Sequence, residues 1–307
     1  MRLPWEQEID GFGGRLWSVA LRAMAIGAML LGVSCPMTGA AGAAAQAPDL
    51  GQVLREGERL VYDVTWMGIK AGQATLEVRG VVPVDGQPAY HLVTTARSTP
   101  FISAFYRVDD RNESYLGVNP LQALRFEKHL REGRYRHSSF TSYDHEGKVA
   151  HYRNLDFNPV PKGIMNLTEA EKYSAYTQEE FPLTPGALDE LSILYYVRGQ
   201  PLLAGRPLQA KVFSNRKNWE VEVNVLGRES LDTVLGRRDT LKVEPLLKFE
   251  GIFQQKGRVL VWLTNDAERI PVLMKSEIVI GSFVATLVRR EVGAALASPQ
   301  PPVPQVP

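Results

Sequence analysis

The chain has 307 residues, 44% of them hydrophobic and 22% charged, and its formal net charge is +1. This length allows one large domain or two smaller ones with a substantial core, and the composition excludes a disordered chain. A nearly neutral chain has no general attraction to nucleic acid or to acidic lipid, so we expect no nucleic-acid partner.

The N-terminal region predicts a signal peptide at residues 1–45. A short apolar run, Ala23–Ser34, follows Arg15 and Arg22, and Gly39–Ala45 contains only glycine and alanine. An apolar run too short to span a bilayer comfortably, followed by small residues at a cleavage point, is typical of exported chains. The alternatives are an uncleaved anchor and a start codon further downstream. Residues 46–57 are then a linker, and the expected location is the periplasm.

Cys35 is the single cysteine in the sequence. A lipidation site needs an aliphatic residue three positions before the cysteine, but Gly32 occupies that position and Leu31 lies one position too early. We therefore favour removal of Cys35 with the signal peptide over an outer-membrane lipoprotein attached through it. The mature chain would then have no disulfide and no thiol nucleophile.

Alternation of apolar and polar residues predicts a succession of antiparallel strands in the first half of the mature chain. These strands are 60–66, 73–79, 89–97, 107–116, 121–130, 134–143 and 148–153. The segment 98–106 fits either a short helix or a loop that carries Phe101 and Phe105. The polar, proline-containing segment 157–182 predicts a long surface connection, with one helical turn at 168–173.

The pattern predicts one helix, at Gly186–Arg198. Leu188, Leu191 and Tyr195 recur at three- and four-residue spacing, and Gly199 follows as a stop signal. A single helix with one apolar face, among many strands, is expected to pack on the concave side of a curved sheet.

Strands resume after this helix, at 208–213, 218–226, 231–235, 238–245, 258–264, 272–280 and 283–287. Arg258–Thr264 has apolar residues on both faces, which predicts a strand covered on both sides. Gly281-Ser282 fits a two-residue hairpin turn. The predicted fold class is mainly β, a large curved antiparallel sheet or half-barrel with one principal helix packed against it. It forms a single domain over residues 58–290, followed by a disordered Ala/Pro tail at 291–307.

Chemical motifs are scarce. The sequence has no nucleophile elbow, phosphate loop or dinucleotide fingerprint, so no catalytic residue, metal site or cofactor is expected. Four histidines (His129, His137, His145 and His151) lack the tight spacing of zinc ligands. The acidic pairs Asp109-Asp110, Asp189-Glu190 and Asp266/Glu268 have no independent support as a hydrolytic pair. The basic residues of 125–153 are interspersed with acidic ones, which favours an ordinary solvated face over a site for an acidic glycan.

The most suggestive feature is a surplus of large apolar residues in turns, in the helix and in the two-faced strand. A sheet with a helix across its mouth could enclose an apolar pocket. The candidate ligand-binding residues are Trp66, Phe101, Phe105, Leu191, Tyr195 and Trp262. The competing interpretation is that these residues only fill the core between helix and sheet.

Four segments together resemble the bacterial domain-of-unknown-function family 3108: GERLVYDVTWMGIKAGQATLEV, LDELSILYYVR, VNVLGRESLDTVLG and VWLTNDAERIPVLMKSEIVIGS. The resemblance covers residues 56–290 and implies an exported, β-rich protein without assigned catalytic residues. The last segment is also remotely similar to the periplasmic lipoprotein-carrier superfamily (LolA/LolB-like), whose half-barrels enclose a lipid-binding cavity. The leading hypothesis is therefore non-enzymatic binding of an apolar or amphipathic envelope ligand. The alternative is a structural or assembly module that binds an envelope protein or glycan, and an envelope hydrolase ranks third.

Overall fold

The computed structural model describes residues 50–156, 177–249, 252–253, 257–277 and 281–295. In chain order the elements are α2 (Leu50–Val53), β1 (Arg55–Glu56), β2 (Arg59–Trp66), β3 (Ile69–Val84), β4 (Gln87–Ser98), α3 (Pro100–Ser103), β5 (Asp109–Gly117), β6 (Ala123–Glu132), β7 (Tyr135–Asp144), β8 (Val149–Asp156), β9 (Thr177–Pro182), α5 (Ser192–Arg198), β10 (Leu208–Ser214), β11 (Lys217–Thr233), β12 (Gly236–Phe249), β13 (Ile252–Phe253), β14 (Arg258–Thr264), β15 (Pro271–Glu277), β16 (Ser282–Glu291) and β17 (Ala294–Ala295). None of the helices in these ranges is long and apolar enough to span a membrane.

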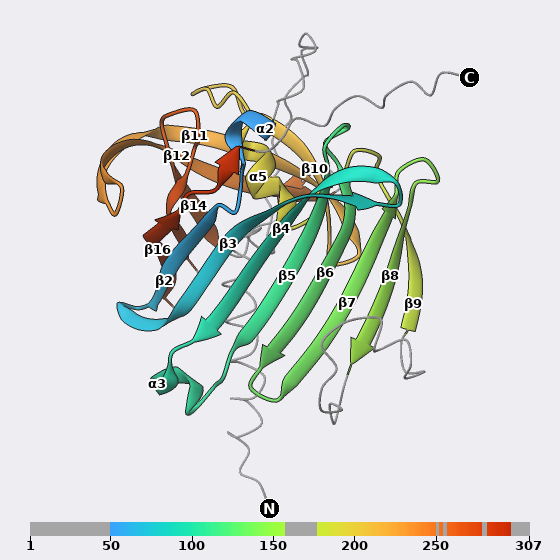
Figure 1. Ribbon diagram of the computed structural model, residues 1–307, viewed down its shortest axis with the longest axis horizontal. Helices are drawn as coiled ribbons and strands as arrows, with labels where there is room; N and C mark the ends of the chain where they lie inside the picture. The colour runs from blue at the N-terminus through green and yellow to red at the C-terminus, as the bar shows by residue number, and fades with distance from the viewer. Residues whose placement is uncertain (1–49, 157–176, 250–251, 254–256, 278–280, 296–307) are drawn as a thin grey trace, which may run out of the picture.

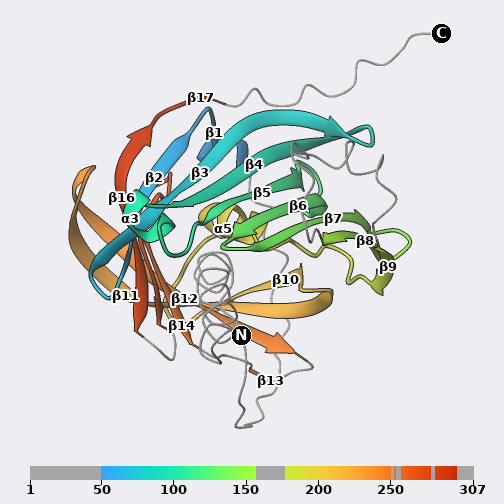
Figure 2. The same ribbon diagram turned by 90° about the horizontal axis from the view of Figure 1, so that it is seen from below.

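One large antiparallel sheet dominates the described residues. Its strands follow the order β10-β11-β12-β14-β15-β16-β2-β3-β4-β5-β6-β7-β8-β9, and β13 pairs with β12. The sheet curls around α5, which lies on its concave side (Figures 1 and 2). The predicted fold class, a curved antiparallel sheet with one principal helix packed against it, is confirmed.

The edge strand β9 meets the other end of the sheet at β11, beside the edge strand β10, through side-chain contacts and not through a hydrogen-bonded ladder. Asn218 Nδ2 donates to the carbonyl of Pro182 at 2.7 Å, and Asn218 Oδ1 accepts from the backbone N–H of Thr184 at 2.8 Å. These contacts join β11 to the end of β9, so the sheet approaches a barrel but is not closed by strand pairing.

The inner face of the sheet changes character along the strand order. On β2 the inward side chains of Leu60, Tyr62 and Val64 are buried and belong to the main apolar core. The neighbouring strands also direct buried apolar side chains toward α5, since alternate positions of a strand lie on one face. From β5 to β8 the inward positions are instead largely polar, as in Lys128 and Ser139. The apolar half forms the core, and the polar half borders the cavity described below.

The helix begins later than predicted, at Ser192 rather than Gly186. Leu188 pairs with β10 as an extended residue, because its N–H donates to Lys211 O and its carbonyl accepts from Phe213 N, both at 2.8 Å. Asp189 then closes the turn before the helix: its Oδ1 accepts from the N–H groups of Leu191 and Ser192, and its own N–H donates to Ser192 Oγ. The apolar periodicity begins before the helix because strand pairing and this turn occupy the first predicted positions.

Three further predictions about local structure are corrected. The expected connection 157–182 ends in strand β9, which pairs with β8 through Ala150 and Phe181; its predicted helical turn lies outside the described residues. The first three residues of the expected separate strand 231–235 are the end of β11, because the ladder with β12 continues past a bulge at Val225/Gly227 as far as Thr233. Glu277 pairs with Ser282, so the turn between β15 and β16 is longer than two residues.

Ordered structure also extends beyond the predicted domain bounds. In the expected linker, α2 places Leu50 and Leu54 in the core, and β1 pairs with β17 of the expected tail. The burial of these two leucines explains why the segment folds. The predicted signal peptide, 1–45, lies outside the described residues.

Candidate functional site

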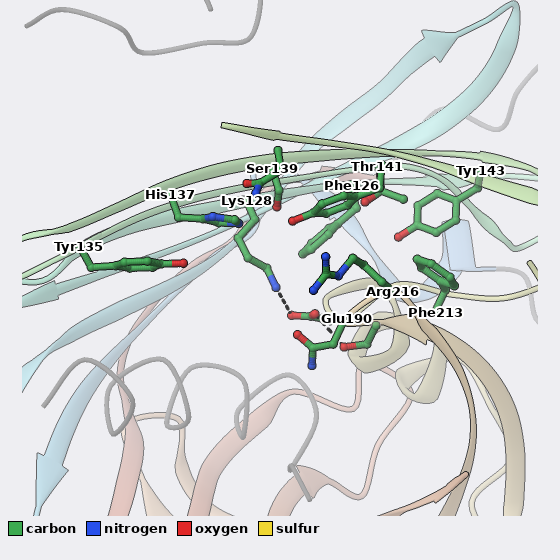
Figure 3. A pocket seen from close by; sticks show the side chains of 14 residues that line it. Phe126, Lys128, Tyr135, His137, Ser139, Thr141, Tyr143, Glu190, Phe213 and Arg216 are labelled. Carbon is green, nitrogen blue, oxygen red and sulfur yellow. Dashed lines mark hydrogen bonds and ion pairs between the residues drawn. The ribbon is translucent and has the colours of Figure 1, made fainter. Parts of the chain in front are cut away.

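A cavity lies on the concave side of the sheet, between β6–β8 and the β10–β11 turn. Its volume is about 370 Å³. It is lined by Phe126, Lys128, Tyr135, His137, Ser139, Thr141, Tyr143, Tyr152, Asn154, Glu190, Phe213, Ser214, Asn215 and Arg216. In Figure 3 it runs along β7 from Tyr135 at one end to Tyr143 at the other.

Strand register aligns the lining residues in rows. Lys128 on β6 is opposite Ser139 on β7, which is opposite Asn154 on β8. In the next row, Phe126 on β6 is opposite Thr141 on β7, which is opposite Tyr152 on β8. Cross-strand neighbours on one face have adjacent side chains, so a row of hydrogen-bonding groups lies beside a row containing two aromatic rings.

An ion pair joins the sheet wall to the segment before α5. Lys128 Nζ lies 2.7 Å from Glu190 Oε2, and Ser214 Oγ donates to Glu190 Oε1 at 2.7 Å (Figure 3). All three residues are buried. A buried carboxylate and ammonium require such pairing, which fixes Lys128 in the cavity wall.

A second buried carboxyl group lies next to Glu190 in the sequence. Burial raises the pKa of Asp189 to about 6, although hydrogen bonds from Ser114 and from the helix N–H groups partly oppose the shift. Tyr143 at the inner end of the cavity is also fully buried, and burial, reinforced by Asp189 and Glu190, raises the pKa of its phenol well above the usual value. Burial therefore disfavours the charged form of both groups.

Arg216 approaches the cavity from the β10–β11 turn. Asn215 and Arg216 have φ values of 50° and 64°, a left-handed conformation that aims the turn at the sheet. The guanidinium lies 5.7 Å from the centre of the Tyr152 ring and 5.9 Å from that of Phe181, and its Nη1 lies 3.5 Å from Glu179 Oε1. This arginine thus bridges the two edges of the sheet at the cavity wall.

The cavity offers hydroxyl, amide and charged groups together with aromatic faces, and its one buried lysine is occupied by a carboxylate. Within the described ranges, no cluster of three or more His, Cys, Asp or Glu side chains is placed to hold a metal ion.

None of the six candidate ligand-binding residues lines this cavity. Leu191 and Tyr195 are buried in the core around α5. Trp262 is on the other face of β14, where its Nε1 donates to Glu229 at 2.7 Å and Lys242 lies over its ring. The other three candidates also lie away from the cavity. Phe101 and Phe105 are at α3, where their ring centroids are 5.8 Å apart. Trp66 is on β2 and stacks on Phe283.

The space between α5 and the apolar half of the sheet is almost filled. Ile193, Leu194 and Val197 pack against β11, β12 and β14, leaving about 40 Å³. Such a gap is the size of about one water molecule, too small for an acyl chain. An apolar ligand site at this helix would therefore require α5 to move.

The histidines and acidic pairs are separated or paired with other residues. His129 is opposite Ser138, whereas His137 is opposite Leu130, so these two histidines are on opposite faces of the sheet. Asp109 binds Arg97 at 2.9 Å on the outer face. Asp110 is buried beside Glu132 and accepts a hydrogen bond from the N–H of Arg131, while burial raises its pKa to about 6.

Most of the cavity residues were not identified from the sequence. A signal did exist: residues 135–143 of β7 carry polar or amphipathic side chains at every second position. Ser138 and Ser142 make the other face polar as well, so alternation alone could not indicate which face lies inside.

The chain belongs to the family described as "Protein of unknown function (DUF3108)", whose model matches residues 61–288. The resemblance inferred from the sequence motifs is thereby confirmed. Comparison with curated proteins gave no match.

Three solved structures match this chain at low sequence identity and low TM-score. A β-barrel-like protein of domain of unknown function DUF1849 from Brucella abortus has 11% identity and a TM-score of 0.49, with 78% of this chain and 99% of that chain covered. A candidate lipoprotein from Parabacteroides distasonis has 10% identity and a TM-score of 0.33, with coverages of 80% and 100%. A candidate exported protein with a YmcC-like fold from Bacteroides fragilis has 9% identity and a TM-score of 0.31, with coverages of 77% and 96%. Since every TM-score is below 0.5, the family match alone classifies the chain.

Proposed function

We propose that the chain is an exported envelope protein that binds an amphipathic ligand without transforming it, and that the cavity on β6–β8 holds the polar part of the ligand. The observation that carries the proposal is the composition of the cavity wall, in which a buried Lys128–Glu190 pair stands beside Ser139, Asn154 and several aromatic rings. Pockets that combine a few fixed polar groups with aromatic faces are typical of small-molecule sites. The apolar run and small residues of 1–45 support export.

The first test is to express the full-length gene in a Gram-negative host, purify the protein natively and record native and denaturing mass spectra. We expect additional mass of ligand size that leaves on denaturation. A chain that carries no such mass, and that binds none of the extracted envelope lipids or glycolipids, would contradict the proposal. That result would favour the assembly-module alternative, in which the partner is an envelope protein or glycan.

A pair of variants on one strand locates the site. Ser139→Leu places a larger apolar side chain in the cavity, whereas Ser142→Leu places the same side chain on the outer face of β7. We expect Ser139→Leu alone to lose the bound mass, with both variants retaining the β-sheet circular dichroism spectrum. Equal retention of ligand by the two variants would exclude this cavity as the site.

A further inference from the structure

Four large apolar side chains are exposed at one end of the central strands β2–β5. Met67 and Ile69 at the β2–β3 turn are 64% and 56% exposed, and Phe101 and Phe105 at α3 are 67% and 81% exposed. We call these four residues the apolar edge. Single exposed apolar residues are normal on protein surfaces, but a group of large ones marks an interaction site.

The two segments of the apolar edge are direct neighbours. The N–H of Thr99, just before α3, donates to the carbonyl of Ala71 on β3 at 2.9 Å, and Gly72 pairs with Ser98 in the β3–β4 ladder. Figure 1 accordingly shows the β2–β3 turn and α3 at the same end of the strands. The two segments that carry these four side chains therefore lie beside each other at one end of the strands, although they come from separate parts of the chain.

Local structure fixes both segments in a projecting form. Met67 has φ 49° and Gly68 has φ 84°, so Met67 occupies a turn position that normally takes asparagine, aspartate or glycine. On the other segment, Thr99 Oγ1 accepts from the N–H of Ile102 and caps α3. A left-handed turn position is unfavourable for methionine, and the Met67 side chain lies partly over Gly281 while most of it stays exposed.

Basic side chains lie beside the α3 part of the apolar edge. Exposed Arg97 and Arg107 share one carboxylate, Asp109, at 2.9 Å and 3.8 Å, so one of the two positive charges is not balanced by that carboxylate. Arg134 in the β6–β7 turn is also exposed. The preceding residue, Gly133, donates its N–H to the carbonyl of Arg107 at 2.7 Å, so this turn lies next to Arg107. This end of the strands therefore combines apolar tips with a fringe of cations.

We infer that the apolar edge docks on the surface of an anionic bilayer, with Met67, Ile69, Phe101 and Phe105 at the headgroup–acyl boundary and Arg97, Arg107 and Arg134 at lipid phosphates. Aromatic and aliphatic tips with a cationic fringe match the two attractions that hold proteins at such interfaces, apolar burial and electrostatic attraction. Tyr135, which borders the outer end of the cavity, follows Arg134 directly, so docking turns that end of the cavity toward the lipid. This inference stands independently of the ligand proposed above.

The test is vesicle flotation with the purified protein and vesicles of phosphatidylethanolamine and phosphatidylglycerol. We expect wild-type protein to float with the vesicles and Phe101→Ser/Phe105→Ser to lose at least about tenfold in apparent affinity, since two largely exposed rings no longer enter the interface. The matched control is Leu203→Ser/Val234→Ser, which removes two comparably exposed apolar side chains elsewhere and should float like wild type.

A charge variant separates the two attractions. Arg107→Gln/Arg134→Gln should weaken flotation with phosphatidylglycerol vesicles and leave any weak binding to phosphatidylcholine vesicles unchanged. Failure of wild-type protein to float, or flotation of the double-serine variant equal to wild type, would overturn the inference. A concentration-dependent dimer that the double-serine variant abolishes, without vesicle binding by wild type, would show that a second copy covers the edge and would also overturn it.

Discussion

Arg198 on α5 and Glu58 before β2 form a buried ion pair with two contacts. Arg198 Nη1 lies 2.7 Å from Glu58 Oε1, Arg198 Nη2 lies 3.2 Å from Glu58 Oε2, and both side chains are 1% exposed. Arg198 also donates to the carbonyl of Glu268, and Arg290 lies 3.6 Å from Glu58 while binding Glu268. This network connects the helix to β2, to β16 and to the β14–β15 turn, and it fixes α5 inside the sheet.

Replacing Glu58 should therefore destabilise the whole fold. Glu58→Ala leaves Arg198 buried without its carboxylate, which costs about 3–5 kcal/mol in comparable buried pairs. Urea unfolding followed by tryptophan fluorescence measures the loss. The control is Glu291→Ala, which breaks a solvent-exposed pair with Arg59 at 3.1 Å and should cost less than about 1 kcal/mol. Similar losses of unfolding free energy in the two variants would show that the buried network contributes no more stability than an exposed ion pair.

Strands that have at least one apolar face could be predicted from the sequence. The predicted strand 258–264 coincides with β14, because apolar residues on both faces require cover on both sides. The network around Glu58 was not accessible, since it joins residues 140 positions apart and charged residues are expected at the surface. Strand β9 was also missed, because its exposed residues show no burial pattern and its strand character comes from pairing with β8.

The candidate site was harder to predict for a related reason. Apolar residues indicate burial, but the cavity is built from buried polar residues such as Lys128 and Glu190, whose partners come from different elements. A sequence pattern does not show which residues Lys128 and Glu190 will pair with. The surplus of apolar residues therefore pointed to Leu191, Tyr195 and Trp262 instead. The structure places these three among core or sheet-covering contacts.

The Lys128–Glu190 pair should show strong energetic coupling. We expect Lys128→Met and Glu190→Gln each to lose about 3 kcal/mol, and the double variant to lose clearly less than the sum, because each single change leaves a buried charge without its partner. Urea unfolding of the four proteins in the cycle gives the coupling. The matched control pair is Lys275–Glu277, with the same 2.7 Å separation but a more exposed position, where coupling should stay within about 1 kcal/mol. Equal coupling in the two cycles would contradict the special role of burial.

Asp110 should make the fold less stable as pH rises. Burial raises the pKa of its carboxyl to about 6, from an ordinary value of 3.8, despite the hydrogen bond from Arg131 and the contact with Glu132. A carboxyl group that holds its proton more tightly when folded stabilises the fold fully below about pH 4, and this contribution disappears by about pH 6. The neighbouring charges of Asp109 and Arg136 act on it in opposite directions.

Asp110→Asn keeps an acceptor for the N–H of Arg131 and removes the titration. Between pH 4 and pH 7, the unfolding free energy of wild type should therefore fall by about 3 kcal/mol relative to that of Asp110→Asn. Asp189 has a similar pKa of about 6 and is present in both proteins, so its contribution cancels in the difference. A difference between the two proteins that does not change with pH would exclude the shifted titration.

Glu113 should show the opposite pH dependence. Burial alone would raise its pKa, but hydrogen bonds from His91 at 2.6 Å and Arg111 at 2.6 Å outweigh burial and hold the pKa at about 2, below the ordinary 4.5. A carboxylate that is ionised more readily in the folded state contributes stability above about pH 4.5, and this contribution is lost as pH falls toward 2. Glu113→Gln should thus cost about 2–3 kcal/mol at neutral pH and progressively less on acidification. Unfolding curves between pH 2.5 and pH 7 measure the difference, and a cost that grows on acidification would refute the assignment, since only Asp110→Asn is expected to change in that direction.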